Sequence, residues 1–337
     1  GSEMCIRDRG IIARVQLEEF SKGIILPHEF TLSKAKEDRL NLMKATNCNF
    51  SQIYALYMDE KHTTLATIDE QSKAKADLEF TDETGVTHRL WIETDEEIIA
   101  KLVADFADRK LYIADGHHRY ETALNYRNYC RENGISKPGD PQDFQMIYLV
   151  DMEHPGLVVF PTHRLVRDLP NFDKEAVLEK CSEFFYIDEK EGTDTMEEDL
   201  KKLYDEGKKA FGFYCGKGEW FLLTLKNIDI MSQMLPNVSK ASQSLDVSVL
   251  HTLILEKIFG IDKENMAKQI NLTYTKFFTE AIDGVDKGEF QCSFVLNPTR
   301  VTEIRDVAAA GEKMPQKSTY FYPKMITGMV MNNLGVD

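Results

Sequence analysis

The sequence predicts a mixed α/β fold that combines α/β and α+β arrangements. Three observations support this prediction. Residues 11–20 (IIARVQLEEF) alternate in polarity, as a half-buried strand does. Residues 95–106 repeat apolar side chains at the spacing of an amphipathic helix, and residues 111–114 (LYIA) form the short apolar run of a buried strand.

The elements expected up to residue 165 alternate along the chain. Strand 11–20 leads past Gly23 and Pro27, which mark turns, into a polar helix at residues 32–45. The segment 111–131 then predicts a strand, a tight turn and a helix. Further expected elements are strands at 51–57 and 89–92, the helix at 95–106, and two neighbouring buried strands at 146–150 and 157–160.

The pattern changes between residues 168 and 240, where acidic helices alternate with a hairpin that turns at residues 216–218. This change predicts an inserted or second α+β subdomain, and the chain divides into residues 11–165, 166–240 and 241–337. Between residues 168 and 240 the expected elements are helices at 175–185 and 195–204 and hairpin strands at 210–214 and 220–225. Beyond residue 240 we expect a long amphipathic helix at 244–259, a strand at 290–296, a helix at 302–310 and an extended basic-aromatic tail at 317–324. Gly1 and Ser2 look like a tag scar, and native sequence is expected to begin near Ile11.

Composition narrows the function classes. The chain has 337 residues, enough for one large or two ordinary domains, and 41 Lys+Arg against 56 Asp+Glu give a net charge of −15. This charge argues against nucleic acid and against an anionic membrane surface as partners. No apolar run approaches the roughly 18 residues of a membrane helix, and the six cysteines are scattered without a CxxC pair. We therefore expect a soluble cytoplasmic protein with neither a nucleic-acid nor a membrane role, whose assembly into a homo-oligomer is left open.

The strongest local motif is ADGHHRYET at residues 114–122. A strand that ends in Asp115-Gly116 and leads directly into a helix places backbone N–H groups where they favour an anion. Arg119 adds a fork suited to phosphate. The charges from Arg109 to Arg131 add up to +3, which makes this segment a basic island in an acidic chain.

Other interpretations of this motif stay open. Asp115 could simply cap the helix while His117 and His118 are solvated turn residues. His117 and Glu121 stand four residues apart on one helical face, which permits a metal site, but the sequence names no third ligand.

Two further segments carry weaker signals. His28 and Glu29 lie on a loop after a strand, where they are suited to general base catalysis and equally to capping the next helix. Residues 311–319 (GEKMPQKST) have the length of a P-loop, but Gln316 stands where the second glycine is required, so the P-loop is rejected. Lys317 and Ser318 could still reach an anion from this loop, or the loop could be a polar turn.

The motifs also resemble known families. IADGHHRYETA, with ILPHEFT upstream, resembles the ParB/sulfiredoxin superfamily, whose strand-turn-helix box holds nucleotide phosphates. Within it the match is closest to the free serine kinases, which also carry a DGHHR box and a PHE segment. From about residue 11 to 328 the chain resembles a bacterial and archaeal family catalogued as a domain of unknown function, number one thousand and fifteen. The matching stretches are ILPHEFT, LYIADGHHRYETA, PTHRLVRDL, LDVSVLH, FVLNPT and AAAGEKMPQKSTYFYPK.

Some residues depart from these families. Sulfiredoxins place a catalytic cysteine in the box where this chain has His117 or His118, which argues against sulfinic-acid reduction. The helix-turn-helix module of ParB proteins is not found. Gln316 replaces a usual proline, and the family usually has a longer segment ahead of Ile11.

The resemblance implies a division of labour along the chain. Residues 11–165 would form a ParB/sulfiredoxin-like nucleotide-binding domain, 166–240 an additional α+β subdomain, and 241–337 a C-terminal α/β segment that contributes the KST loop. Asp115 would hold Mg²⁺ or the transferring phosphoryl group, and Glu29 would accept the proton of a substrate hydroxyl with His117 assisting. The nucleotide phosphates would be held by Gly116, His117, His118, Arg119, Lys317 and Ser318, and the substrate or the site would be supported by His28, His163 and Arg164.

The resulting hypothesis is a nucleotide-dependent phosphotransferase that uses ATP or ADP, with Mg²⁺, and acts on a small hydroxyl compound such as free serine. One alternative is a phosphatase or nucleotide hydrolase that uses the same phosphate cradle on water. Another is a non-catalytic nucleotide-sensing module. The hypothesis assumes that Glu29, Asp115 and Lys317 meet in space.

Overall fold

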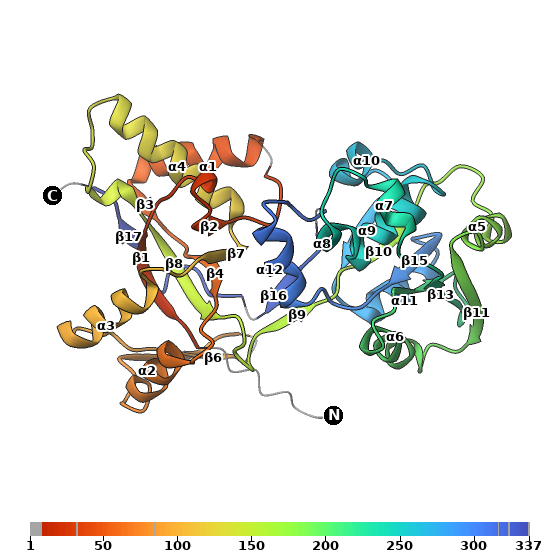
Figure 1. Cartoon of the computed structure of the whole chain (residues 1–337), viewed down its shortest axis with the longest axis horizontal. Helices are drawn as coiled ribbons and strands as arrows, with labels where there is room; N and C mark the ends of the chain where they lie inside the picture. The colour runs from red at the N-terminus through yellow and green to blue at the C-terminus, as the bar shows by residue number, and fades with distance from the viewer. Residues whose placement is uncertain (1–8, 32, 84, 316, 323, 336–337) are drawn as a thin grey trace. The chain divides into compact units, whose positions relative to one another are not determined.

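The computed structural model in Figure 1 describes residues 9–31, 33–83, 85–315, 317–322 and 324–335, and it confirms the mixed α/β class. The chain forms two compact units. The first contains Gly1–Pro27, Thr31–Val158 and Pro323–Asp337, and the second contains His28–Phe30 and Val159–Tyr322. The described residues 9–27 and 324–335 therefore belong to the same unit.

A five-stranded mixed sheet forms the centre of the first unit. Its strands, in spatial order, are β1 (Ile11–Gln16), β8 (Phe144–Asp151), β4 (Ile53–Tyr57), β7 (Leu111–Asp115) and β2 (Ile25–Leu26). The β8–β4 and β7–β2 pairs are parallel, and the other two pairs are antiparallel. All five residues of β4 are buried, as expected for a central strand with both faces covered.

Two helices of the first unit pack against each other, α1 (Ser33–Thr46) and α4 (His117–Glu132), which Figure 1 shows side by side. Tyr120 of α4 is fully buried in the core, and its hydroxyl donates to the carbonyl oxygen of Glu18 at 2.8 Å. Ala123 and Tyr126 join the same core. These contacts fix α4 on the sheet and so fix the position of its first turn at the end of β7.

Smaller elements complete the first unit. Asp95 caps α3 by accepting from the backbone N–H groups of Glu97 at 2.9 Å and Ile98 at 3.2 Å, which explains why the helix predicted at 95–106 begins there. The elements are α2 (Thr63–Gln71), α3 (Glu96–Phe106), the hairpin of β5 (Leu78–Thr81) with β6 (Thr87–Leu90), and the pair of β3 (Cys48–Asn49) with β17 (Asn332–Asn333).

The second unit contains a six-stranded sheet in which all neighbouring strands are antiparallel. The predicted hairpin at 210–214 and 220–225 is present as β12 and β13. In spatial order the strands are β11 (Phe185–Glu191), β13 (Glu219–Leu225), β12 (Ala210–Tyr214), β15 (Cys292–Val295), β10 (His163–Val166) and β14 (Leu272–Thr275). This one sheet takes strands from both sides of residue 240, and the three-part division of the chain stays a prediction.

Each face of this sheet has its own core. On one face, α6 (Met196–Asp205) and α11 (Phe278–Asp286) pack buried apolar side chains against the strands. On the other, the Phe294 ring stacks on Phe213 at 4.9 Å between centroids and contacts Phe259 at 5.7 Å.

The remaining elements of this part are α5 (Lys174–Cys181), α7 (Ile230–Met234), α8 (Lys240–Gln243), α9 (Asp246–Val249), a π-helical segment (Leu250–Glu256), α10 (Lys263–Lys268), α12 (Val301–Ala309) and the paired strands β9 (Val158–Phe160) and β16 (Tyr320–Tyr322).

The structure corrects two predictions. The run at 157–160 was expected to neighbour the strand at 146–150, but β9 is only half-buried and pairs with β16, outside the sheet of β8. The long amphipathic helix expected at 244–259 is instead the short α9 followed by the π-helical segment. Residues 245–255 are all buried, so this stretch has no solvent-exposed face even though it contains polar residues such as Asp246 and His251.

Some element boundaries also differ. The strand expected at 11–20 ends at Gln16, and residues 20–22 form a 3₁₀ turn. The helix expected at 175–185 ends at Cys181, because Phe185 starts β11 and is buried in the second sheet. The helix expected at 302–310 is confirmed as α12. In the part of the chain that the structure describes, no helix is long and apolar enough to cross a membrane.

Candidate functional site

The turn between β7 and α4 has a geometry that only glycine adopts easily. Gly116 has φ 100° and precedes the first helical residue. A Cβ at this position would lie 3.0 Å from Nε and Nη2 of Arg119. Gly116 therefore allows the Arg119 side chain to fold back against the turn from which its own helix starts.

Arg119 is held by hydrogen bonds from several sides. Its Nη2 pairs with Oδ2 of Asp115 at 2.7 Å, and its Nη1 donates to Oγ of Ser51 at 2.9 Å and to the carbonyl oxygen of Gln52. Burial lowers the pKa of Arg119, and the neighbouring Asp115 carboxylate opposes this effect. The result is a guanidinium group with a fixed orientation beside the DGHHR turn.

A cavity of about 490 Å³ lies beside this guanidinium, within the first unit. Its walls carry three cationic side chains, Arg39, Arg119 and Lys324, and one carboxylate, Asp115, so the ionisable lining has a net charge of +2. Nζ of Lys324 lies 2.8 Å from Oδ1 of Asp115. Arg39 pairs with no carboxylate in the described part of the chain. Phe50 adds an aromatic wall. The cavity thus favours an anionic ligand.

Other predicted residues of the motif lie at the same turn but do not line this cavity. Gly116 and His117 form the turn and the first helical position, and His117 is buried, while His118 is half-buried. The phosphate-binding role of these three residues stays a prediction. Glu121 accepts from Oγ1 of Thr31 at 2.7 Å and pairs with Lys36 at 2.6 Å. Its carboxylate is therefore bound to these side chains, which does not favour the metal site that its spacing from His117 permits.

The basic island of the sequence does not form a continuous surface. Arg109 pairs with Asp59 at 3.0 Å, Arg131 pairs with Asp143 at 2.6 Å, and Arg127 pairs with Glu19. Acidic side chains from elsewhere in the unit therefore neutralise three of the local arginines. The positive charge that remains beside the turn comes from Arg119 together with Arg39 and Lys324, which are distant in sequence.

The protein groups around Asp115 do not form a metal site by themselves in the described structure, and the Mg²⁺ role of Asp115 stays a prediction. Each oxygen of this carboxylate already faces a cation, Arg119 on one side and Lys324 on the other. Among the described residues no group of three His, Cys, Asp or Glu side chains could hold a metal ion. A Mg²⁺ ion that arrives with a nucleotide needs only one or two protein carboxylates, because phosphate oxygens and water complete its shell.

A second group of predicted residues gathers in the second unit. His28 is fully buried, and its Nε2 lies 3.2 Å from Oγ1 of Thr319, while its carbonyl oxygen accepts from the backbone N–H of Met314 at 2.7 Å. The Ser318 hydroxyl donates to the carbonyl oxygen of Pro315 at 2.5 Å and is therefore engaged within its own loop. The PHE segment and the KST loop are thus bound to each other, and Gln316 lies outside the described residues.

Arg164 ties the same loop to the sheet. The side chain is fully buried, and Nη2 donates to the carbonyl oxygen of Lys317 at 3.2 Å and to Nε2 of His251 at 3.1 Å. Burial lowers the pKa of Arg164 to about 10, so the group stays charged near neutral pH. His251, in the π-helical segment, accepts this bond as a neutral ring, because burial and Arg164 lower its pKa far below the usual value. Arg164 therefore supports the position of Lys317.

His163 predicts a measurable pH dependence of stability. Burial, and secondarily the charge of Arg164, lower its pKa to about 4, against about 6.5 in an unfolded chain. Because the ring is neutral in the folded protein, its contribution to the free energy of unfolding is fully present above pH 6.5. This contribution is lost as the pH falls from 6.5 toward 4, by about 3 kcal/mol in total. In urea unfolding from pH 7.5 to 4, the stability difference between wild type and His163→Gln should shrink with falling pH. A difference that stays constant over this range would contradict the assignment.

The site residues expected from the sequence are divided between the units. Glu29 and Lys317 belong to the second unit, and Asp115 belongs to the first. Their approach to one another stays a prediction. Two residues of the cavity, Arg39 and Lys324, were missed. Lys324 was visible only as part of the basic-aromatic tail, and Arg39, on a polar helix, gave no signal.

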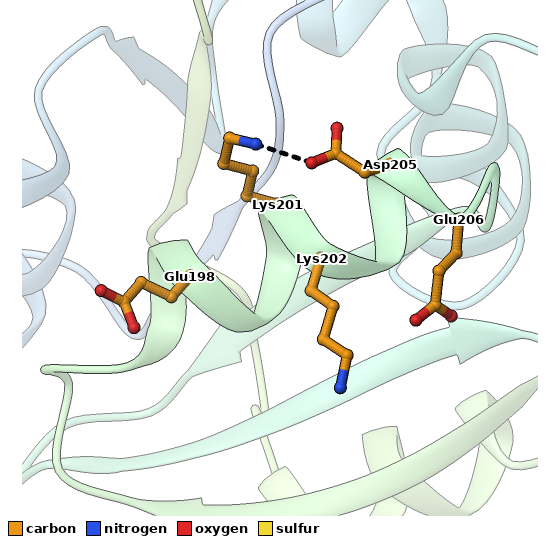
Figure 2. Close-up of a pocket in the computed structure, with 5 residues that line it drawn as sticks. All are labelled: Glu198, Lys201, Lys202, Asp205 and Glu206. Carbon is orange, nitrogen blue, oxygen red and sulfur yellow. Dashed lines mark hydrogen bonds and ion pairs between the residues drawn. The ribbon is translucent and has the colours of Figure 1, made fainter.

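Another concavity, of about 460 Å³, lies on the surface of α6 and carries no candidate chemistry. Figure 2 shows that its side chains come from one helix and diverge, with Lys201 and Asp205 on one side and Lys202 and Glu206 on the other. Lys201 and Asp205 pair at 2.6 Å, four residues apart. Such ion pairs are ordinary for a solvated helix surface.

Gly116→Ala separates the role of this glycine in folding from its role in the site. We expect a stability loss of about 1 kcal/mol from the left-handed backbone, together with displacement of Arg119 and weaker binding of an anionic probe such as ADP in the cavity. Gly134→Ala is the matched control, because Gly134 also has positive φ (68°) but has nothing within 4 Å of an added Cβ. Thermal unfolding should show similar stability losses for the two variants, whereas ADP titration should show weaker binding by Gly116→Ala than by Gly134→Ala. Equal ADP affinities of the two variants would contradict the role of Gly116 in the site.

The structure therefore describes a two-unit, mixed α/β protein with a cationic cavity beside a strand-turn-helix motif. The chain belongs to the family described as "Protein of unknown function (DUF1015)", whose model matches residues 3–248. No curated protein matches the sequence.

Solved structures with similarity to this chain share little sequence with it. A conserved hypothetical protein from Pyrococcus furiosus is 14% identical, with 98% of this chain and 97% of that chain covered and a TM-score of 0.44. A free serine kinase in complex with AMP is 13% identical, with 95% and 90% covered and a TM-score of 0.45. A C-terminally truncated SbnI from Staphylococcus aureus is 11% identical, with 95% and 85% covered and a TM-score of 0.42.

Proposed function

We propose that this protein is a nucleotide-dependent phosphotransferase of the ParB/sulfiredoxin-like class that phosphorylates a small hydroxyl compound, with free serine as the first acceptor to test. The proposal rests chiefly on one observation. Arg39, Arg119 and Lys324 line one cavity with a single carboxylate, directly beside the DGHHR turn. The resemblance of this turn and of the PHE segment to those of the free serine kinases supports the choice of substrate.

The cavity suits a nucleotide for three reasons. Its excess positive charge favours phosphate groups, and the Arg119 fork matches the geometry of phosphate oxygens. Phe50 supplies an aromatic face on which a base can stack. The volume of about 490 Å³ falls in the usual range for small-ligand sites. ADP and ATP are therefore the ligands we propose.

Phosphoryl transfer mainly requires that reactants be positioned and that charge on the phosphoryl oxygens be stabilised. Arg119 supplies positive charge at a fixed place, and Lys324 adds a second positive charge at the cavity wall. In the proposed reaction Glu29 accepts the proton of the acceptor hydroxyl while that oxygen attacks the terminal phosphorus of the nucleotide. The bond from this phosphorus to the bridging oxygen breaks, so that ADP leaves from ATP or AMP leaves from ADP. Arg164 and His28 act indirectly, because they position the loop that contains Lys317 and Thr319.

The proposal is tested by following phosphorus directly. The protein is incubated with ATP or ADP in a buffer containing Mg²⁺, with or without serine and related hydroxy amino acids, and the products are observed by ³¹P NMR. We expect a phosphomonoester that forms only when an acceptor is present. Release of inorganic phosphate without an acceptor would favour a nucleotide hydrolase, and nucleotide that binds but remains unchanged would favour a sensing module.

A further inference from the structure

The last described segment of the chain, residues 324–335, forms a strap along the first unit. Its far end is firmly attached. Leu334 is buried in the core, and its backbone N–H donates to the carbonyl oxygen of Asn47 at 2.7 Å. Asn332 pairs with Asn49 between β17 and β3, and its Nδ2 donates to Oδ1 of Asn49 at 2.9 Å. The strap is therefore part of the fold of this unit.

The near end of the strap forms a wall of the cationic cavity. Lys324, Met325 and Thr327 line the cavity, and Nε2 of Gln52 donates to the carbonyl oxygen of Ile326 at 3.3 Å. Gln52 also accepts from Arg119 through its own carbonyl oxygen. One residue thus connects the strap to the guanidinium beside the DGHHR turn.

The ion pair of Lys324 can be exchanged at little cost. Nζ of Lys324 lies 2.8 Å from Oδ1 of Asp115, with side-chain exposures of 36% and 39%. Ion pairs this exposed contribute little to stability, because water and salt screen them. Asp115 also keeps a partner when Lys324 leaves, because its other oxygen, Oδ2, is paired with Arg119 at 2.7 Å.

We propose that Lys324 is a phosphate-binding residue of this cavity, and that it leaves Asp115 to pair with the ligand when a polyanionic nucleotide binds. This inference rests on the proposed function. The strap positions Lys324 at the cavity wall, and Arg119 stays paired with Asp115 after Lys324 has left it. The net charge of +2 on the cavity lining favours a nucleoside diphosphate over an uncharged nucleoside.

The test compares three variants of the full-length chain by calorimetric titration with ADP, AMP and adenosine. Lys324→Met should weaken ADP binding about tenfold, should weaken AMP binding less, and should leave adenosine binding unchanged. It should also reduce the salt dependence of ADP binding. Lys324→Arg, which preserves the charge, should bind ADP nearly as wild type does. The control is Lys44→Met, because Lys44 lies on α1 of the same unit, stacks over Tyr129 and does not line the cavity.

The outcomes separate this inference from the function on which it rests. Undiminished ADP binding by Lys324→Met, with wild type binding normally, would overturn the role of Lys324 and leave the proposed function standing. An equal loss of adenosine and ADP binding would also overturn it, because the lysine would then act on the shape of the cavity. Failure of wild type to bind ADP at all would overturn the proposed function itself.

Discussion

Arg119→Met is expected to lower the affinity for ADP by about 10- to 100-fold, because it removes charge-assisted hydrogen bonds from the centre of the cationic cavity. Arg119→Lys should fall between this variant and wild type, since lysine keeps the charge but cannot present two parallel N–H groups. Isothermal titration calorimetry at fixed salt concentration measures the effect. Thermal unfolding of each variant accompanies the titrations, because Arg119 also bonds to Ser51 and to Gln52 within the fold.

Arg131→Met provides a matched control for this experiment. Arg131 lies on the same helix, α4, and is also paired with an aspartate, Asp143, at 2.6 Å, but it does not line the cavity. Its replacement should leave ADP affinity unchanged. If Arg131→Met weakened binding as strongly as Arg119→Met, the effect would reflect the general charge or stability of the unit, and the assignment of Arg119 would be wrong.

Glu29→Gln is expected to reduce phosphoryl transfer by about 10²- to 10⁴-fold, because glutamine cannot accept the proton of the acceptor hydroxyl. ADP and ATP should bind to this variant as to wild type, since Glu29 is not among the residues that line the cavity. The expected result is therefore a large fall in kcat without a change in the dissociation constant for nucleotide. A ³¹P NMR time course and a nucleotide titration measure the two quantities.

The control for Glu29 is Glu179→Gln, which removes an exposed carboxylate from α5 of the same unit and should be active. Full turnover by Glu29→Gln would show that another group takes the proton, while the nucleotide site would be unaffected. Loss of nucleotide binding by Glu29→Gln would contradict a role confined to proton transfer.

Elements whose determinants are local in the sequence could be predicted correctly. The β7-turn-α4 unit was predicted because its signals are contiguous: an apolar run, a glycine at the turn and a helical pattern after it. The hairpin of β12 and β13 was predicted for the same reason, since its glycine-rich turn lies between two short apolar strands. Arg119 belongs to this local motif, and the structure places it beside the cavity.

Features that depend on contacts between distant segments could not be predicted from local patterns. Lys324 and Asp115 are 209 residues apart, and no local pattern connects them. The run at 157–160 has the composition of a buried sheet strand, but its partner, β16, lies far along the chain. Residues 244–259 were expected to have a polar face, yet tertiary packing buries both sides of the π-helical segment. Burial and pairing over such distances depend on the assembled fold.

A crystal structure of the protein with ADP tests the central claim most directly. The account predicts that the diphosphate lies in the cavity of the first unit, with phosphate oxygens about 3 Å from the Arg119 guanidinium and from Nζ of Lys324. It also predicts that Lys324 has moved away from Asp115 while Arg119 still pairs with that carboxylate. ADP bound elsewhere, with this cavity empty and the pair of Lys324 and Asp115 intact, would contradict the account.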